Sequence, residues 1–231
     1  MQIPLWIVRE DAQTAHHRAQ FMDTPDAATL VNMQDWLVRF SDVVGTHWGM
    51  ATSKQRPPDD FDPFVVKLPR ERWDPPDYID FGGFPLVSRR FRDAVGAVPD
   101  TIQYLPVTVL EGGKSALAQD YRLLNTLAAQ PALDLVHSKQ GRPERMRIGG
   151  RTFYAPRLVD SYLLLPNIVP ATEIFHESQI PGISIATDAF AERVIKAGCT
   201  GIEFRDPATF LVLNGTLRYR TADGIAERWL G

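Results

Sequence analysis

The chain has 231 residues, of which 44% are hydrophobic and 23% charged, with a formal net charge of −3. This composition is typical of a globular protein of one large or two small domains and excludes a disordered chain. The small negative charge does not favour nucleic acid or an acidic membrane surface as a partner. The single cysteine, Cys199, excludes an intramolecular disulfide and a thiolate cluster for zinc.

The N-terminal residues predict a strand followed by a helix. Residues 3–8 form an apolar run that is too short for a signal-peptide core, and no stretch approaches the roughly 20 apolar residues of a membrane helix. We therefore expect a cytoplasmic protein. Thr24 is a suitable N-cap for a helix that continues to Val44. Its apolar stripe recurs at three- and four-residue spacing through Leu30, Met33, Leu37, Phe40 and Val44.

Residues 57–80 contain six of the eighteen prolines, which argues against a regular helix and any central strand. The segment has seven acidic and three basic residues, and four aromatic residues are interleaved with them. We expect extended chain that packs against the core, with an acidic surface that suits a partner's basic cleft. A solvated segment without a partner is the alternative. The candidate partner-binding residues are Asp59, Asp60, Asp62, Trp73, Asp74, Asp77 and Tyr78.

Two hairpins are predicted further along the chain. Gly149-Gly150 separates the short strands 146–148 and 151–153, and Asn214-Gly215 separates 210–213 from 216–219. Residues 139–157, around the first hairpin, carry six basic residues and one acidic residue, a net charge of +5. This segment predicts contact with phosphates or with an acidic protein surface, or else a solvated hairpin.

An internal repeat relates residues 86–106 to residues 185–207. Each copy predicts a short apolar strand, a hydroxyl N-cap, an amphipathic helix of about two to three turns and a return strand. Gly198 is a suitable C-terminal stop for the second helix, whereas Pro99-Asp100-Thr101 predicts a remodelled end for the first. The aligned pairs are Ser88 with Thr187, Phe91 with Phe190, Asp93 with Glu192, Val95 with Val194, Ile102 with Ile202 and Tyr104 with Phe204.

These two copies resemble a known family. The phrases FPLVSRRFRDAV and ISIATDAFAERVIKAGCTGIEF look like the paired hallmark of the eleventh catalogued immunity family of bacterial polymorphic toxin systems. DYRLLNTL, ALDLVHS, RTFYAPRLVDS and TEIFHE follow between them in the order that the family shows, so the likeness covers about residues 80–210.

The resemblance implies a protein that is made beside a secreted toxin, binds this toxin and blocks it. It supplies no catalytic residue, metal or cofactor, and it leaves homo-oligomerisation open. The residues of its motif look structural: Ser88, Phe91, Thr187, Phe190, Gly201 and Phe204. We expect an α+β fold with a mixed sheet, two similar strand–helix–strand units, short helices and β-hairpins. Residues 1–80 would pack on a main domain formed by residues 81–231.

Two other functions stay open at this point. An enzyme that reverses a toxin's modification, for example a hydrolase, would need Asp134, His137 and His176 to converge in a pocket. A nucleic-acid-binding module would use the arginines of residues 139–157. Other signatures are incomplete: Gly112-Gly113-Lys114-Ser115 has no opening glycine for a phosphate loop, and His176-Glu177 is not followed by a second metal-binding histidine at position 180.

Overall fold

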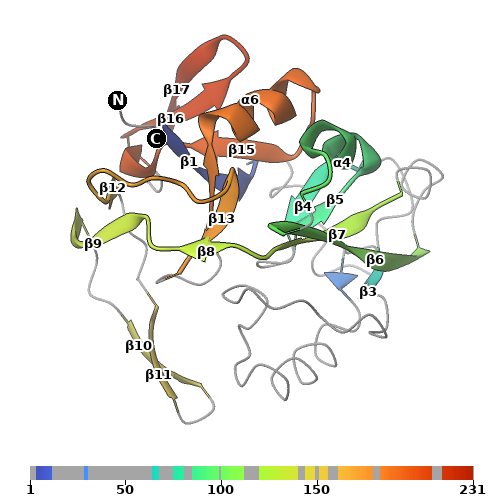
Figure 1. Ribbon diagram of the computed structural model, residues 1–231, viewed down its shortest axis with the longest axis horizontal. Coiled ribbons are helices and arrows are strands. Elements are labelled where there is room, and N and C mark those ends of the chain that lie inside the picture. The colour runs from blue at the N-terminus through green and yellow to red at the C-terminus, as the bar shows by residue number, and fades with distance from the viewer. Residues whose placement is uncertain are drawn as a thin grey trace.

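The two strand–helix–strand units organise the α+β fold, as the repeat predicted (Figure 1). The computed structural model describes residues 4–11, 29–30, 64–67, 75–80, 85–98, 100–111, 120–139, 144–148, 151–155, 161–178, 183–209 and 215–230. Within them, no helix is long and apolar enough to cross a membrane.

The strands are β1 (Leu5–Glu10), β2 (Thr29–Leu30), β3 (Phe64–Lys67), β4 (Tyr78–Asp80), β5 (Pro85–Val87), β6 (Ile102–Glu111), β7 (Arg122–Thr126), β8 (Ala129–Gln130), β9 (Leu133–Lys139), β10 (Glu144–Ile148), β11 (Arg151–Ala155), β12 (Ser161–Leu164), β13 (Ile174–Glu177), β14 (Ser184–Thr187), β15 (Ile202–Arg205), β16 (Gly215–Thr221) and β17 (Gly224–Leu230). The helices are α4 (Arg89–Val95), α6 (Asp188–Lys196) and the 3-10 turn η1 (Pro207–Thr209).

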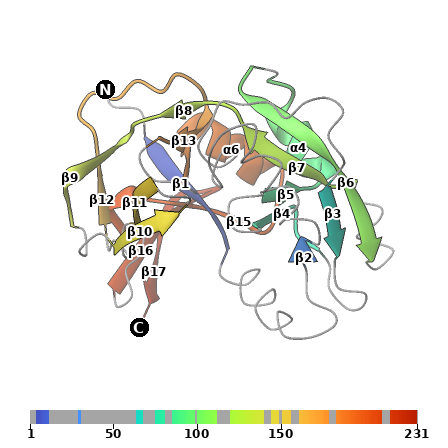
Figure 2. The same ribbon diagram turned by 90° about the horizontal axis from the view of Figure 1, so that it is seen from below.

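The strands form two large sheets and two ladders. One sheet has the order β17-β16-β15-β1-β14-β13-β8, and the other has the order β2-β3-β6-β7-β5-β4. The ladders are β10-β11 and β12-β9. Figure 2 shows how β7 and β8 lead from one large sheet into the other along a single stretch of chain.

The two units share a topology that goes beyond the repeated sequence. In the first unit, β5 precedes helix α4, β6 follows it, and β7 lies between these strands and is antiparallel to both. In the second unit, β14 precedes α6, β15 follows it, and β1 occupies the equivalent central place, again antiparallel to both neighbours. In the first unit the central strand is β7, which follows β6 directly in the chain. In the second unit the central strand is β1, which comes from the start of the chain.

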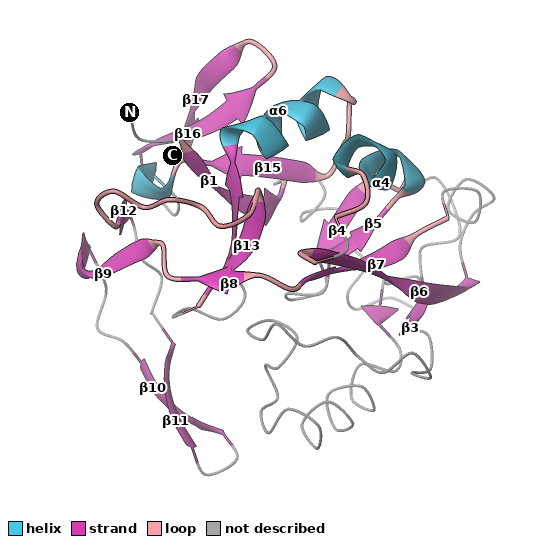
Figure 3. Ribbon diagram, viewed as in Figure 1, coloured by secondary structure: helices cyan, strands magenta, loops and turns pink. Residues whose placement is uncertain are grey.

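Each helix begins at a capping hydroxyl. Ser88 Oγ accepts the backbone N–H of Phe91 at 3.3 Å, and Thr187 Oγ1 accepts the N–H of Phe190 at 3.4 Å. These bonds satisfy donors that the first turn of a helix leaves without an intrahelical partner. The two phenylalanine rings meet edge to face with centroids 6.3 Å apart, where α4 and α6 lie side by side (Figure 3).

The helix ends differ, as Pro99-Asp100-Thr101 predicted. Helix α6 ends with Gly198 at φ +68°, and the N–H groups of Gly198 and Cys199 bond back to the carbonyls of Ile195 and Val194. This is the paired bonding of a Schellman motif. Helix α4 ends earlier, at Gly96, whose φ is +79°.

Strand β1 is buried on both faces, which explains its uninterrupted apolar sequence. Trp6 and Val8 belong to the core beneath the two helices, which also contains both phenylalanines of the repeat. Leu5 and Ile7 point to the opposite face and pack in a second core with Tyr162 of β12 and Leu133 of β9. The strand predicted at residues 3–8 is therefore confirmed, with bounds of Leu5–Glu10.

Two predictions for the N-terminal region are wrong where the structure describes it. Thr29 and Leu30 form strand β2, which pairs with β3, instead of belonging to a helix. The other residues of that predicted helix lie outside the described residues. Strand β3 lies between β2 and β6, so the proline-rich segment does contain an inner strand. The reason is local, because residues 64–67 include no proline.

The hairpin at Gly149-Gly150 is confirmed, since Ile148 pairs with Arg151 in the β10-β11 ladder. The upstream arm of the hairpin predicted at Asn214-Gly215 lies outside the described residues. Strand β16 pairs along its whole length with β17, through a two-residue turn at Ala222-Asp223 that was not predicted. Asp223-Gly224 is a turn dipeptide, so the signal for this hairpin was present in the sequence.

Candidate functional site

Asp77, one of the candidate partner-binding residues, is 3% exposed and joins the two units. Its Oδ1 accepts the hydroxyl of Ser88 at 2.5 Å, and its Oδ2 accepts the backbone N–H of Thr200 at 2.9 Å and the Thr200 hydroxyl at 3.2 Å. Arg90 adds an ion pair at 3.4 Å. One carboxylate thus holds the cap of the first helix against the turn that follows the second.

Tyr78, another candidate, is 4% exposed and lies in the core, with its ring centroid 6.1 Å from that of Phe91. Its backbone N–H donates to the carbonyl of Thr200 at 3.1 Å. Asp77 and Tyr78 are therefore interior residues. The other five candidates, Asp59, Asp60, Asp62, Trp73 and Asp74, lie outside the described residues, and the acidic surface stays a prediction for them.

The three candidates for an enzyme occupy two strands. Asp134 Oδ2 and His137 Nδ1 of β9 are 2.7 Å apart, and Asp134 Oδ1 also accepts the backbone N–H groups of Val136 and His137. This local turn lies in a β-bulge. Between the pairs Ser161–Lys139 and Leu163–Asp134, strand β9 has more residues than strand β12. The bond from His137 holds the pKa of the Asp134 carboxyl below its usual range.

His176 lies on β13, so the start of a zinc-protease signature that it forms with Glu177 is on a strand rather than a helix. Its Nδ1 is 3.3 Å from the hydroxyl of Ser184. Glu177 is fully buried, and its Oε2 accepts the backbone N–H groups of Ala132 and Leu133 at 2.8 and 2.9 Å. This carboxylate fixes the start of β9. Among the described residues, no group of three histidine, cysteine or acidic side chains is placed to hold a metal.

Burial of His176 has a consequence for stability. It lowers the pKa of the imidazole from 6.5 to about 4, because the charged form loses its water. The unfolded state therefore binds a proton between these two values while the folded state does not. We expect the free energy of unfolding to fall by about 2 kcal/mol between pH 7 and pH 5. Urea denaturation across this range should show the loss, and the His176→Gln variant should not.

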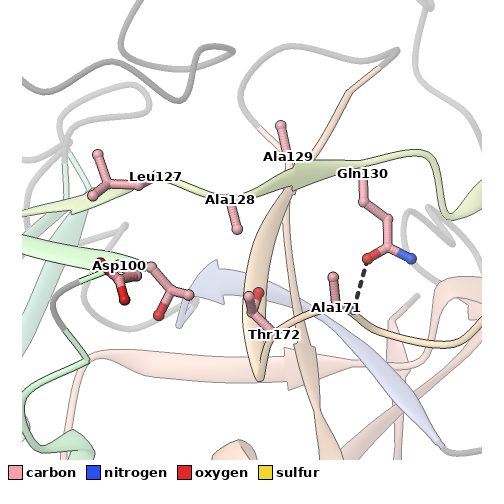
Figure 4. A pocket seen from close by; sticks show the side chains of 8 residues that line it. Asp100, Leu127, Ala128, Ala129, Gln130, Ala171 and Thr172 are labelled. Atoms are coloured by element: carbon pink, nitrogen blue, oxygen red, sulfur yellow. Dashed lines mark hydrogen bonds between the residues drawn. The ribbon is translucent and has the colours of Figure 1, made fainter.

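One hollow, of about 540 Å³, lies beside β8 between the two sheets (Figure 4). Small side chains form most of its wall, and Gln130 is engaged there with the backbone of Ala171 at 2.9 Å. Asp100 is the one ionisable side chain among its lining residues. The wall of this hollow therefore offers no acid–base pair.

A second hollow, of about 420 Å³, is lined mainly by apolar side chains of β1, β12, η1 and β17. Leu163 and Ile225 both line it and remain 46% and 54% exposed. The one acidic residue in its wall, Asp206, pairs with Arg218 at 2.9 Å. We call this feature the apolar hollow. It was not predicted, because its walls come from four segments that are distant in the sequence.

Comparison with known proteins bears on what these surfaces are for. No curated protein matches the chain. The model of the immunity protein family (Imm11) matches residues 9–209, which is most of the chain. The chain belongs to the Imm11 immunity protein family. The match confirms the resemblance and extends it upstream of residue 80, where the likeness seen in the motifs began. In this Imm11 protein the matched region includes both units, and the β16-β17 hairpin lies beyond it.

Proposed function

We propose that this Imm11 protein binds a cognate bacterial toxin in the cytoplasm and neutralises it by covering the toxin's working surface. Family membership carries the proposal. The fold supports it, because the candidate acid–base residues do not share a pocket: His176 is buried on β13, whereas His137 is exposed on β9. A rigid scaffold with a large accessible surface suits occlusion, since tight complexes depend on preorganised surfaces.

Co-expression with the toxin domain of the adjacent reading frame tests the proposal. We expect the toxin to co-purify with the chain, in a complex of nanomolar or tighter affinity that weakens with added salt. Cells that express the toxin should grow only when the chain is present. A toxin that neither co-purifies with the chain nor loses activity beside it would end the proposal.

An enzyme that reverses the toxin's modification is the alternative, and the Asp134–His137 pair is the observation that favours it. We expect alanine at Asp134, His137 and His176 to leave protection intact, because occlusion does not use these groups. Growth of toxin-expressing cells is the readout, with the amount of soluble variant measured in parallel. Loss of protection by a variant that is still soluble and still binds the toxin would favour the enzyme.

A further inference from the structure

We propose that β17 accepts a strand of the toxin along its outer edge, so that the partner extends the sheet that ends in the β16-β17 hairpin. The added strand would carry a basic residue between two apolar residues. This inference rests on the proposed function and specifies the surface that binds the toxin. It commits to a protein partner that binds in extended conformation.

Strand β17 differs from the other strands that end the two large sheets. As described, β8 and β2 have two residues each and β4 has three, whereas β17 has seven. Short end strands are poor templates for another chain, and in β4 the backbone N–H of Tyr78 already donates to Thr200. Figures 1 and 2 both show the β16-β17 hairpin at the margin of the molecule. Among these four end strands, β17 is therefore the one that can align several residues of a partner.

The backbone of β17 presents a row of hydrogen-bonding groups along its outer edge. Thr221 and Gly224 close a two-residue turn, so they form a hydrogen-bonded pair, and such pairs alternate along an antiparallel ladder. The N–H and C=O groups of Ile225, Glu227 and Trp229 therefore face away from β16. Within the described chain, β16 is the only strand that pairs with β17. Another extended backbone supplies donors and acceptors at the spacing that these outward groups require.

The side chains of the same three residues specify the partner strand. They lie on one face of β17, because alternate residues of a strand share a face. Ile225 and Trp229 are 54% and 69% exposed, and between them the Glu227 side chain is 63% exposed. Arg218 is 3.7 Å from Glu227 but 2.9 Å from Asp206, so it compensates the Glu227 charge only weakly. A lysine or arginine opposite Glu227, with apolar residues two positions to either side, complements this pattern.

A second copy of this chain fits the edge less well. Two β17 strands that pair antiparallel about a two-fold axis, with Ile225 opposite Trp229, place Glu227 opposite Glu227. Like charges directly opposite each other destabilise a strand pair. A charged side chain on an edge strand is also a means by which proteins prevent pairing between identical chains. Glu227 thus opposes self-association and attracts a basic partner.

A proline at the outer edge tests the hydrogen-bonding part of the inference. Because the N–H of Glu227 does not face β16, Glu227→Pro removes one outward donor and leaves the hairpin ladder intact. Isothermal titration calorimetry measures binding to the toxin domain of the adjacent reading frame. We expect Glu227→Pro to bind at least about tenfold more weakly. The control is Ala222→Pro, in the turn of the same hairpin, which should bind like the wild type.

Charge reversal separates the side chain from the backbone. Glu227→Lys keeps every backbone group of β17, so its effect reports the carboxylate. We expect slower association with the toxin and binding that is at least about tenfold weaker, with both effects reduced at high salt. The control is Asp93→Lys, which reverses a similarly exposed carboxylate on α4 and should bind like the wild type. Circular dichroism and thermal unfolding verify that the variants fold.

Amide hydrogen exchange followed by NMR distinguishes strand addition from other contacts. In the free chain, the outward amides of Ile225, Glu227 and Trp229 should exchange faster than those of Ala226 and Arg228, which face β16. In the complex with the toxin, the three outward amides should become protected as well. If they exchange in the complex as fast as in the free chain, no strand has been added and the inference is wrong.

The remaining outcomes are distinct. If the wild type binds the toxin and both Glu227→Pro and Glu227→Lys bind equally well, the edge of β17 is not the docking site, while the proposed function stands. If the wild type neither binds the toxin nor protects cells from it, both fail. The inference is also overturned if light scattering shows a wild-type dimer that Glu227→Pro converts to monomer, because a second copy then occupies the edge.

Discussion

Replacing Asp77 by alanine is expected to lower the free energy of unfolding by about 3 kcal/mol, because a buried polar group left without its partner costs about 1–3 kcal/mol and two donors lose their acceptor here. The substitution would leave the buried Ser88 hydroxyl without its acceptor and would also remove the acceptor of the partly buried Thr200 N–H. For a chain of this length the midpoint of thermal unfolding should fall on the order of 10 °C. Urea denaturation measures the free energy directly.

Asp93→Ala provides the comparison on the same unit. Asp93 is 72% exposed and pairs with Arg89 at 3.7 Å, so its loss should cost no more than about 0.5 kcal/mol. If Asp77→Ala were as mild as Asp93→Ala, the carboxylate would not join the two units as the structure indicates. Asp77→Asn should be intermediate, because its amide oxygen can replace only one of the two acceptor atoms.

The repeat could be predicted because its signals are local. A hydroxyl cap, a phenylalanine three residues later and an apolar return strand all fall within about twenty residues, and each favours its element without help from the rest of the chain. The similar topology of the two units could not be predicted. It depends on β1 and β7 filling equivalent central places, and pairing between segments some 180 residues apart leaves no periodic signal.

The errors have the same origin. The apolar spacing at Leu30 fits a helix, yet pairing with Val66 of β3 decides the conformation there. The prolines around β3 suggested that no inner strand was present, although a strand of four residues fits between them. In both cases a tertiary contact overrode a local preference.

The candidate site was predictable only in part. Acidic residues next to aromatic ones indicate a binding surface when they are exposed, but Asp77 and Tyr78 are interior residues. Burial depends on what the rest of the chain places over a segment, and the sequence of that segment does not contain this information. The apolar hollow shows the opposite case, since Leu163 and Ile225 look like core residues in the sequence and are exposed in the fold.

Gly201→Ala is expected to destabilise the protein by about 4 kcal/mol, because two effects add at this position. Gly201 has φ +84°, where a side chain costs about 1 kcal/mol or more. A Cβ there would also lie 2.2 Å from the carbonyl oxygen of Tyr78 and 2.6 Å from Cβ of Pro76. Neither neighbour can yield easily, since the N–H of Tyr78 is bonded to Thr200.

Gly198→Ala separates the two effects. Gly198 has φ +68°, close to that of Gly201, but a Cβ added there would meet no atom within 4 Å. Its substitution should therefore cost only the conformational part, about 1 kcal/mol. Equal losses in the two variants would mean that the turn after α6 does not press against the segment entering β4. If Gly201→Ala lowers the free energy of unfolding by about 3 kcal/mol more than Gly198→Ala does, the close backbone contact between Gly201 and Tyr78 contributes to stability. This contact would then join the two units alongside the Asp77 carboxylate.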